Sequence, residues 1–143
     1  MQESSSYKKL LNSLKDRKAT VGVIGMGYVG LPLAIAYGEA GFNVLGIDID
    51  ENKVNKINNS RSYINHISSD RLSSIVDLNF LKATNKFDSV NTLDAIILCL
   101  PTPLNKYREP DLSYIRSTLN AIGPYLKKGQ VLSLESTTYP GTT

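Results

Sequence analysis

The 143 residues have the length of one domain, and 41% hydrophobic with 20% charged residues is typical of a globular protein. The formal net charge is +3, and the basic residues of segment 8–18 indicate a solvated helix face, not a patch for nucleic acid or membrane. The single cysteine excludes an internal disulfide and a multi-thiolate metal site, and neither a transmembrane run nor a signal-peptide core is present, so we expect a cytoplasmic protein.

The first eighteen residues are polar, with an apolar stripe formed by Tyr7, Leu10, Leu11 and Leu14. This helical spacing predicts a short amphipathic helix that packs against the domain or against a neighbouring subunit. We therefore treat residues 1–18 as an N-terminal helix or tail, and residues 19–143 as the principal domain.

Strand and helix patterns alternate from residue 20 onward. Strands are expected over residues 20–24, 43–47, 80–84, 94–100 and 130–134, and helices over 31–40, 51–58, 69–76 and from a cap at Asp111 to about 126. Gly41 and Gly129 are placed to end two of these helices, and residues 61–67 are expected to form a loop. The continuous apolar run 94–100 is typical of a central strand covered on both faces. The alternation predicts an α/β fold, a Rossmann-type doubly wound and mainly parallel sheet with helices on both faces.

The sequence stops in the loop 135–141, after the last expected strand. An open doubly wound sheet binds its ligands at the carboxyl ends of the strands. We therefore expect these residues to be the N-terminal part of a longer enzyme, cut before the segments that complete its site.

A glycine-rich turn, Gly25-Met26-Gly27-Tyr28-Val29-Gly30, lies between the first expected strand and helix. The glycine spacing alone is weak evidence, but the strand before it and the helix after it match a dinucleotide-binding motif. In that motif Gly25 permits the tight turn, Gly27 lets the backbone approach a pyrophosphate, and Gly30 permits close helix–strand packing. The helix N-terminus adds unpaired N–H groups and the positive end of its dipole.

Asp48 follows the second expected strand, at about the distance where this motif places an acid. Its carboxylate can accept hydrogen bonds from both hydroxyls of an adenosine ribose, and it repels a 2′-phosphate, which favours NAD over NADP. Asp50 is the competing candidate, although it can instead cap the helix at residue 51. A structural turn beside an unrelated aspartate is the remaining alternative.

Further blocks accompany the glycine turn. They are Gly46-Ile47-Asp48-Ile49-Asp50 with Lys53-Val54, Ser62-Tyr63-Ile64, Pro101-Thr102-Pro103-Leu104, Arg108 to Ser113, and Leu134 to Thr143. Together they resemble the UDP-glucose/GDP-mannose dehydrogenase family over nearly everything after residue 20. The last two blocks are more specific than the glycine turn, and they look most like the UDP-N-acetylglucosamine 6-dehydrogenase branch.

The resemblance implies oxidation of the primary alcohol of a UDP-hexose to the uronic acid with two NAD, for surface polysaccharide synthesis, with UDP-N-acetylglucosamine as the best match. An enzyme cysteine is expected to hold the aldehyde stage as a thiohemiacetal, assisted by lysine, asparagine and aspartate residues, all beyond residue 143. The family also implies a homodimer or larger assembly, and no nucleic-acid or membrane partner. By themselves, residues 1–143 are expected to bind NAD weakly and to oxidise nothing.

The family pattern also implies which residues hold the cofactor: Gly25, Gly27, Tyr28, Val29, Gly30, Asp48, Lys53, Thr102 and Thr138. Within this set, the Val29 backbone meets the pyrophosphate, and Asp48 and Lys53 meet the adenosine end. Thr102 lines the cofactor from a strand-end loop. Thr138 is also the catalytic candidate, because a hydroxyl can donate and accept while it positions water or a substrate oxygen near the nicotinamide.

Several polar residues also have a structural interpretation. Lys53 can be a solvated helix lysine, Thr102 can brace the turn between two prolines, and Thr138 can be a loop hydroxyl without a ligand. Glu135, at a strand end, either touches the nicotinamide ribose or forms a local salt bridge.

Cys99 and His66 are the single cysteine and the single histidine. Cys99 lies within an apolar run, where desolvation raises the thiol pKa and limits access, so we interpret it as part of the core and not as the family nucleophile. His66 is interpreted as a loop residue with a hydrogen-bonding role.

Two other functions remain open on the sequence. One is the NAD-binding half of a hydroxyacid or 6-phosphogluconate-type dehydrogenase, which the downstream chain would distinguish. The other is a module that binds NAD without turnover.

Overall fold

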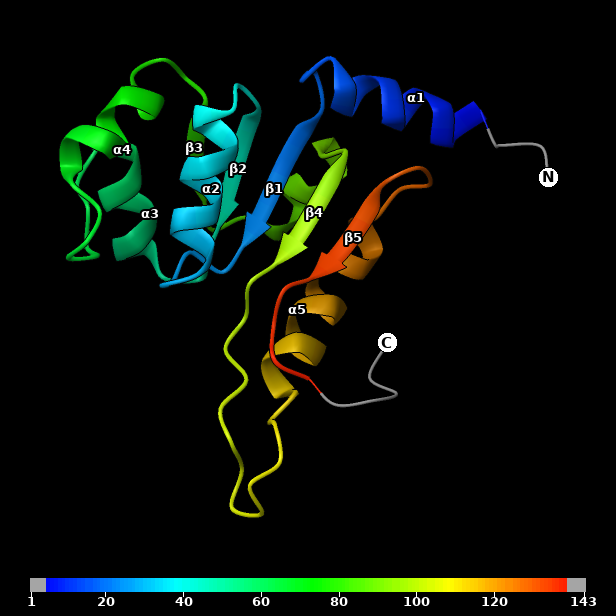
Figure 1. Cartoon of the computed structure of the whole chain (residues 1–143). Coiled ribbons are helices and arrows are strands. Elements are labelled where there is room, and N and C mark those ends of the chain that lie inside the picture. The colour runs from blue at the N-terminus through cyan, green and yellow to red at the C-terminus, as the bar shows by residue number, and fades with distance from the viewer. Residues whose placement is uncertain (1–4, 139–143) are drawn as a thin grey trace.

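The computed structural model describes residues 5–138 and shows a five-stranded sheet with helices on both faces (Figure 1). The strands are β1 (Thr20–Ile24), β2 (Asn43–Ile47), β3 (Leu81–Thr84), β4 (Ala95–Leu98) and β5 (Val131–Leu134). They lie in the order β3-β2-β1-β4-β5, and every pairing is parallel. The chain winds outward from β1 in both directions, so the expected Rossmann-type fold is confirmed, with its crevice between β1 and β4.

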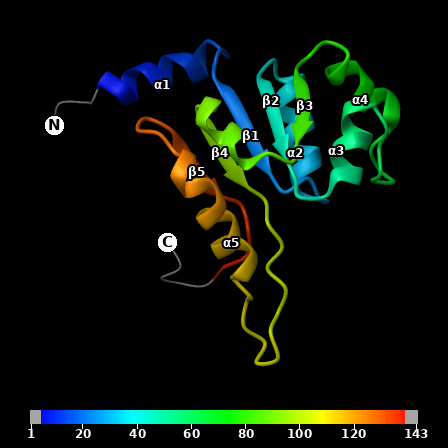
Figure 2. The same cartoon turned by 180° about the vertical axis from the view of Figure 1, so that it is seen from behind.

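Three helices cover one face of the sheet: α2 (Gly30–Glu39), α3 (Glu51–Asn58) and α4 (Ser69–Val76) (Figure 2). Each turns one apolar stripe inward, which is the reason these amphipathic segments form helices here. The stripes consist of Leu31, Ala34 and Ile35 on α2, Val54 and Ile57 on α3, and Leu72 and Ile75 on α4. They pack on strand residues such as Val21 and Val23, and burial of each large aliphatic side chain contributes about 1.5–3 kcal/mol.

The opposite face carries α5 (Ser113–Ile122) and two short 3₁₀ helices, η1 (Phe87–Thr92) and η2 (Gly123–Tyr125). Val90 of η1 and Ile122 of α5 are fully buried against Ile96 and Leu98 of β4. The sequence pattern gave no indication of η1, because its six residues carry only one buried side chain.

The N-terminal helix α1 (Ser5–Lys15) lies along the edge of the sheet where the strands begin (Figure 1). None of its residues is buried, although Leu10, Leu11 and Leu14 are half-buried. Ser6 approaches Gly129 in the turn before β5. The helix expected over 1–18 is therefore present over 5–15, and residues 1–4 lie outside the described part of the chain.

Two further elements are shorter than predicted by more than one residue. The helix expected to reach residue 126 ends at Ile122, because Pro124 has no N–H to continue the α-helical hydrogen bonds, and the 3₁₀ helix η2 follows with this proline near its start. Gly129 therefore ends no helix but forms the turn into β5, with φ of +94°. The strand expected over 94–100 is paired only over Ala95–Leu98.

The loop between β4 and α5 projects beyond the carboxyl edge of the sheet (Figure 1). An antiparallel bridge between Leu104 and Pro110 closes its outer part. The cap expected at Asp111 is not confirmed: the N-cap residue of α5 is Leu112, which makes no side-chain cap hydrogen bond. Asp111, one position earlier, accepts a hydrogen bond at 2.9 Å from the N–H of Ser113. No helix within residues 5–138 combines the length and the apolar character needed to cross a bilayer.

Candidate functional site

The glycine turn has the backbone geometry that the sequence predicted for its three glycines. Gly25 has a φ of +92°, which L side chains rarely adopt, and a Cβ there would also strike the carbonyl oxygen of Cys99. A Cβ at Gly30 would overlap the carbonyl oxygen of Gly25. At Gly27, by contrast, a Cβ would meet no atom within 4 Å outside its own residue and its two neighbours in the chain. Two of the glycines are therefore needed by the fold, whereas the space beside Gly27 is open and can admit a ligand.

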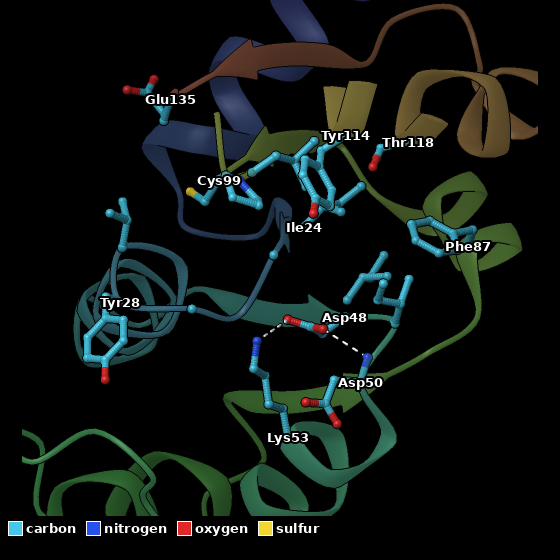
Figure 3. Close-up of a pocket in the computed structure, with 17 residues that line it drawn as sticks. Ile24, Tyr28, Asp48, Asp50, Lys53, Phe87, Cys99, Tyr114, Thr118 and Glu135 are labelled. Carbon is cyan, nitrogen blue, oxygen red and sulfur yellow. Dashed lines mark hydrogen bonds and ion pairs between the residues drawn. The ribbon is translucent and has the colours of Figure 1, made fainter. Parts of the chain in front are cut away.

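Asp48 lies just beyond β2 and is 7% exposed (Figure 3). Its Oδ2 accepts a hydrogen bond from the Met26 N–H at 2.8 Å and lies 3.5 Å from the Lys53 Nζ. Its Oδ1 accepts from the Asp50 N–H at 2.9 Å. These contacts fix the carboxylate beside the glycine turn, and its unused lone pairs can still accept from hydroxyl groups.

Asp50 has the capping role that was its alternative interpretation. Its Oδ1 accepts a hydrogen bond from the Asn52 N–H at 2.9 Å, and it stands at the N-cap of α3. Its side chain also lines the cavity, but the helix cap occupies one of its oxygens.

A cavity of about 490 Å³ lies along the carboxyl edge of the sheet between the glycine turn and the β4 end (Figure 3). This volume falls within the roughly 300–1,000 Å³ of small-molecule sites. From the expected set, the cavity is lined by Gly25, Gly27, Tyr28, Val29, Asp48 and Lys53. Gly30 stands behind the turn and supports it.

The apolar wall of this cavity was not predicted from the sequence. That wall is formed by Ile49, Phe87, Leu100, Pro101 and Tyr114, with the Thr118 side chain beside them. Tyr114 and Thr118 are one helical turn apart on α5, so their spacing was a usable signal once α5 was placed behind the β4 end. Phe87 belongs to η1 and gave no such signal.

Thr102 and Thr138 are not among the residues that line this cavity. Both are half-buried in loops, Thr102 after β4 and Thr138 after β5. Glu135 does line the cavity, and its Oε1 accepts a hydrogen bond from the Ser133 hydroxyl at 2.7 Å. The roles expected for both threonines stay predictions.

Cys99 is buried, as expected, but it also lines the cavity. Burial raises the pKa of the Cys99 thiol, and the nearby Glu135 carboxylate raises it further. The expectation that Cys99 is part of the core is therefore confirmed, and the structure adds that the same residue forms part of the cavity wall. His66 is exposed, and its imidazole makes no hydrogen bond to another residue of the 5–138 segment, so the role expected for it is not confirmed.

These residues fit a dinucleotide. The open space at Gly27 and the N-terminus of α2 suit a pyrophosphate, since no acceptor within residues 5–138 pairs with the N–H groups of Gly27, Tyr28 and Val29. The Asp48 carboxylate suits a ribose diol, and the apolar wall suits a flat base.

Comparisons with known proteins agree with this geometry. Residues 19–143 match the NAD binding domain of the UDP-glucose/GDP-mannose dehydrogenase family. UDP-N-acetyl-D-mannosamine dehydrogenase of Pyrococcus horikoshii is 35% identical over 124 residues, covering 86% of this chain and 29% of that protein. UDP-N-acetyl-D-glucosamine 6-dehydrogenase of Salmonella typhi is 31% identical, covering 86% of this chain and 28% of that protein.

A solved structure extends the similarity to α1. The NDP-N-acetyl-D-galactosaminuronic acid dehydrogenase of Methanosarcina mazei superposes with a TM-score of 0.82 at 31% identity, covering 99% of this chain and 32% of that protein. The chain thus spans about 30% of the length of the relatives it matches. It belongs to the UDP-glucose/GDP-mannose dehydrogenase family and corresponds to its NAD-binding domain.

Proposed function

We propose that this chain is the cofactor-binding part of an NAD-dependent UDP-sugar 6-dehydrogenase, which oxidises the primary alcohol of a UDP-N-acetylhexosamine to the uronic acid. The observation that carries the proposal is the empty space at Gly27 beside the fixed Asp48 carboxylate. When bound, NAD accepts hydride from the sugar. This chain holds the cofactor and encloses one side of it.

Each part of the cavity has a task in this proposal. The turn N–H groups bind the pyrophosphate, and Asp48 with Lys53 binds the adenosine ribose, where the carboxylate repels a 2′-phosphate. The apolar wall excludes water from the base. Thr102 and Thr138 are proposed to act at the nicotinamide end, with Thr138 placing water or a substrate oxygen.

UDP-N-acetylglucosamine is the first candidate substrate. Its support is the pattern of the blocks around residues 108–113 and 134–143. UDP-N-acetylmannosamine is the second candidate, because relatives named for that substrate are more similar to this chain, at up to 38% identity. The two sugars differ only in the configuration of the carbon that bears the acetamido group. We therefore do not expect this cofactor-binding domain to select between them.

The test is to assay the full-length gene product with UDP-N-acetylglucosamine, UDP-N-acetylmannosamine, UDP-glucose and GDP-mannose, counting NADH formed per sugar. We expect two NADH per molecule of the preferred UDP-N-acetylhexosamine. A single NADH per sugar, or turnover of a hydroxyacid in place of a nucleotide sugar, would contradict the proposal.

Residues 1–143 alone provide a second test. They are expected to bind NAD without reducing it in the presence of any of these sugars. NAD reduction by this segment alone would show that its own residues suffice for the chemistry.

A further inference from the structure

We propose that Tyr63 is a positioning residue for the cofactor: its hydroxyl orients the Met26–Gly27 peptide so that the Gly27 N–H faces the pyrophosphate. The inference rests on the NAD-binding role proposed above. Tyr63 itself does not line the cavity, so it acts through the glycine turn and not by touching NAD.

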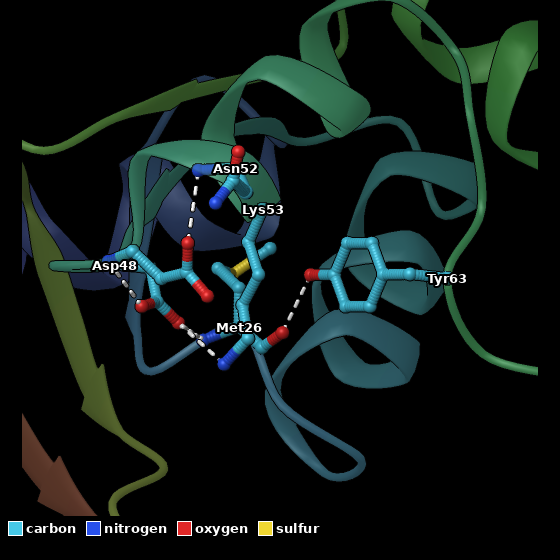
Figure 4. A network of polar contacts seen from close by, with 6 residues as sticks. Met26, Asp48, Asn52, Lys53 and Tyr63 are labelled. Carbon is cyan, nitrogen blue, oxygen red and sulfur yellow. Dashed lines mark hydrogen bonds and ion pairs between the residues drawn. The ribbon is translucent and has the colours of Figure 1, made fainter.

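The hydroxyl of Tyr63 donates a hydrogen bond to the carbonyl oxygen of Met26 at 2.5 Å (Figure 4). The two residues are distant in the chain, since Tyr63 belongs to the loop between α3 and α4. The ring is half-buried, and the neighbouring segment is anchored in the core by Ile64 and Ile67. The donor is therefore held in place by the packing of its own ring against the core and by the buried residues that follow it.

Peptide geometry transmits this contact to the cavity. No peptide bond of the described chain is cis, so the Met26 carbonyl and the Gly27 N–H of the same planar unit point in opposite directions. Because the carbonyl is held toward Tyr63, the N–H is held away from it. Gly27 lines the cavity, and its N–H has no acceptor within residues 5–138. An unpaired donor aimed at the pyrophosphate position is what an anion site requires.

The other parts of Met26 are fixed independently of Tyr63. Its N–H donates to Asp48 Oδ2, and its side chain is fully buried beside Gly46, where a Cβ would come within 2.7 Å of the Met26 Cε. Loss of the Tyr63 hydroxyl would thus free only the carbonyl end of the residue. Burial and the carboxylates of Asp48 and Asp50 raise the pKa of Tyr63, so the hydroxyl stays a donor throughout the working pH range.

The matched pair of variants is Tyr63→Phe and Tyr37→Phe in the 143-residue chain. Tyr37 is also a half-buried tyrosine, on α2, where its ring packs edge-on against Phe42 and no hydrogen bond joins its hydroxyl to another residue in 5–138. Both variants remove one hydroxyl and keep the ring. Affinities for NAD, ADP and adenosine are measured by calorimetry or by competition, and the Gly27 amide is followed by NMR in the free protein.

We expect Tyr63→Phe to weaken NAD and ADP about three- to tenfold, the effect of one lost hydrogen bond, and to shift the Gly27 amide resonance. Adenosine, which lacks phosphates, should bind as before, and Tyr37→Phe should change none of these affinities. A purely structural role would weaken adenosine and ADP alike, and that result would overturn the proposal, as would unchanged ADP binding. Absence of NAD binding by the unmodified chain would instead overturn the cofactor assignment and the Tyr63 inference together.

Discussion

The two sides of the cavity are built differently. On the adenosine side, the glycine turn and Asp48 come from two short segments, and backbone N–H groups hold the carboxylate at 2.8 and 2.9 Å. On the other side, the wall combines the β4 end with Tyr114 of α5 and Glu135 after β5. There the loops are joined by the Ser136 hydroxyl, which accepts from the Leu100 N–H and donates to the Leu100 carbonyl.

This difference separates features that local sequence specifies from features that long-range packing specifies. The adenosine side depends on backbone conformation and on one fixed acid, both of which follow from residue type and spacing. The β4–β5 side depends on where α5 and the loops after β4 and β5 pack. That packing is set by contacts between residues far apart in the sequence. We therefore expect single substitutions on the first side to have large and specific effects on NAD, and the second side to respond weakly.

Gly27→Val should have the largest effect, because the added side chain enters the space that receives the pyrophosphate. We expect NAD binding to fall below detection in calorimetry. The thermal midpoint should stay near that of the unmodified chain, since no atom outside the neighbouring residues of the chain lies within 4 Å of a Cβ at this position.

Gly30→Ala is the control for that variant. Its Cβ would overlap the Gly25 carbonyl oxygen, so it should destabilise the chain by about 1–3 kcal/mol in urea unfolding. If Gly27→Val instead lost stability and Gly30→Ala did not, the roles of the two glycines would be reversed.

Asp48→Asn should weaken NAD by about 1–3 kcal/mol, the range for a hydrogen bond to a charged group, and should reduce the preference over NADP. Asp50→Asn is the matched variant, because asparagine also caps helices well and α3 should persist. Titrations with NAD and with NADP measure the ratio of the two affinities. An equal loss of NAD affinity in Asp50→Asn would indicate that residue 50, and not residue 48, contacts the ribose.

Cys99 offers a probe of the β4 side without mutation. Because burial and Glu135 raise the pKa of the thiol, little thiolate is present at neutral pH, and alkylation by iodoacetamide should be slow and should accelerate as the pH rises. Saturating NAD should slow it further, since Cys99 lines the cavity. Mass spectrometry measures the rate, and a rate unaffected by NAD would place the cofactor away from the β4 end.

Glu39→Gln should have the smallest effect, because its bidentate pair with Arg71 joins α2 to α4 outside the cavity. Hydrogen bonding to Arg71 lowers the pKa of Glu39, so the pair stabilises the fold above the ordinary pKa of a glutamate and loses this contribution as the pH falls through the folded-state value. Both side chains are about 40% exposed, so solvent screens the pair.

Thermal melts measure this contribution. The unmodified chain should melt slightly higher than Glu39→Gln at neutral pH, and the difference should disappear in acid and shrink in high salt. NAD affinity should not change, and a change would mean that the contact between α2 and α4 influences the cofactor site.

The predicted bounds match the structure closely for the elements whose own residues mark where they begin and end. The strand before the glycine turn and the one before Asp48 have the predicted bounds, because short apolar runs bounded by glycine or aspartate are unambiguous. The α5 helix was overestimated because its apolar spacing continues past Pro124. The 3₁₀ helix η1 was missed, and with it the Phe87 wall of the cavity.

The sequence by itself determined the parallel α/β fold, the glycine turn, the acid that faces it and the family. These follow from local requirements, namely a φ that only glycine accepts readily, a backbone that must approach a ligand, and an acid at a strand end. Only the tertiary structure decided that Cys99 forms a wall of the cavity and that Tyr63 reaches the Met26 carbonyl. These depend on contacts between residues far apart in the chain, for which spacing in the sequence carries no signal.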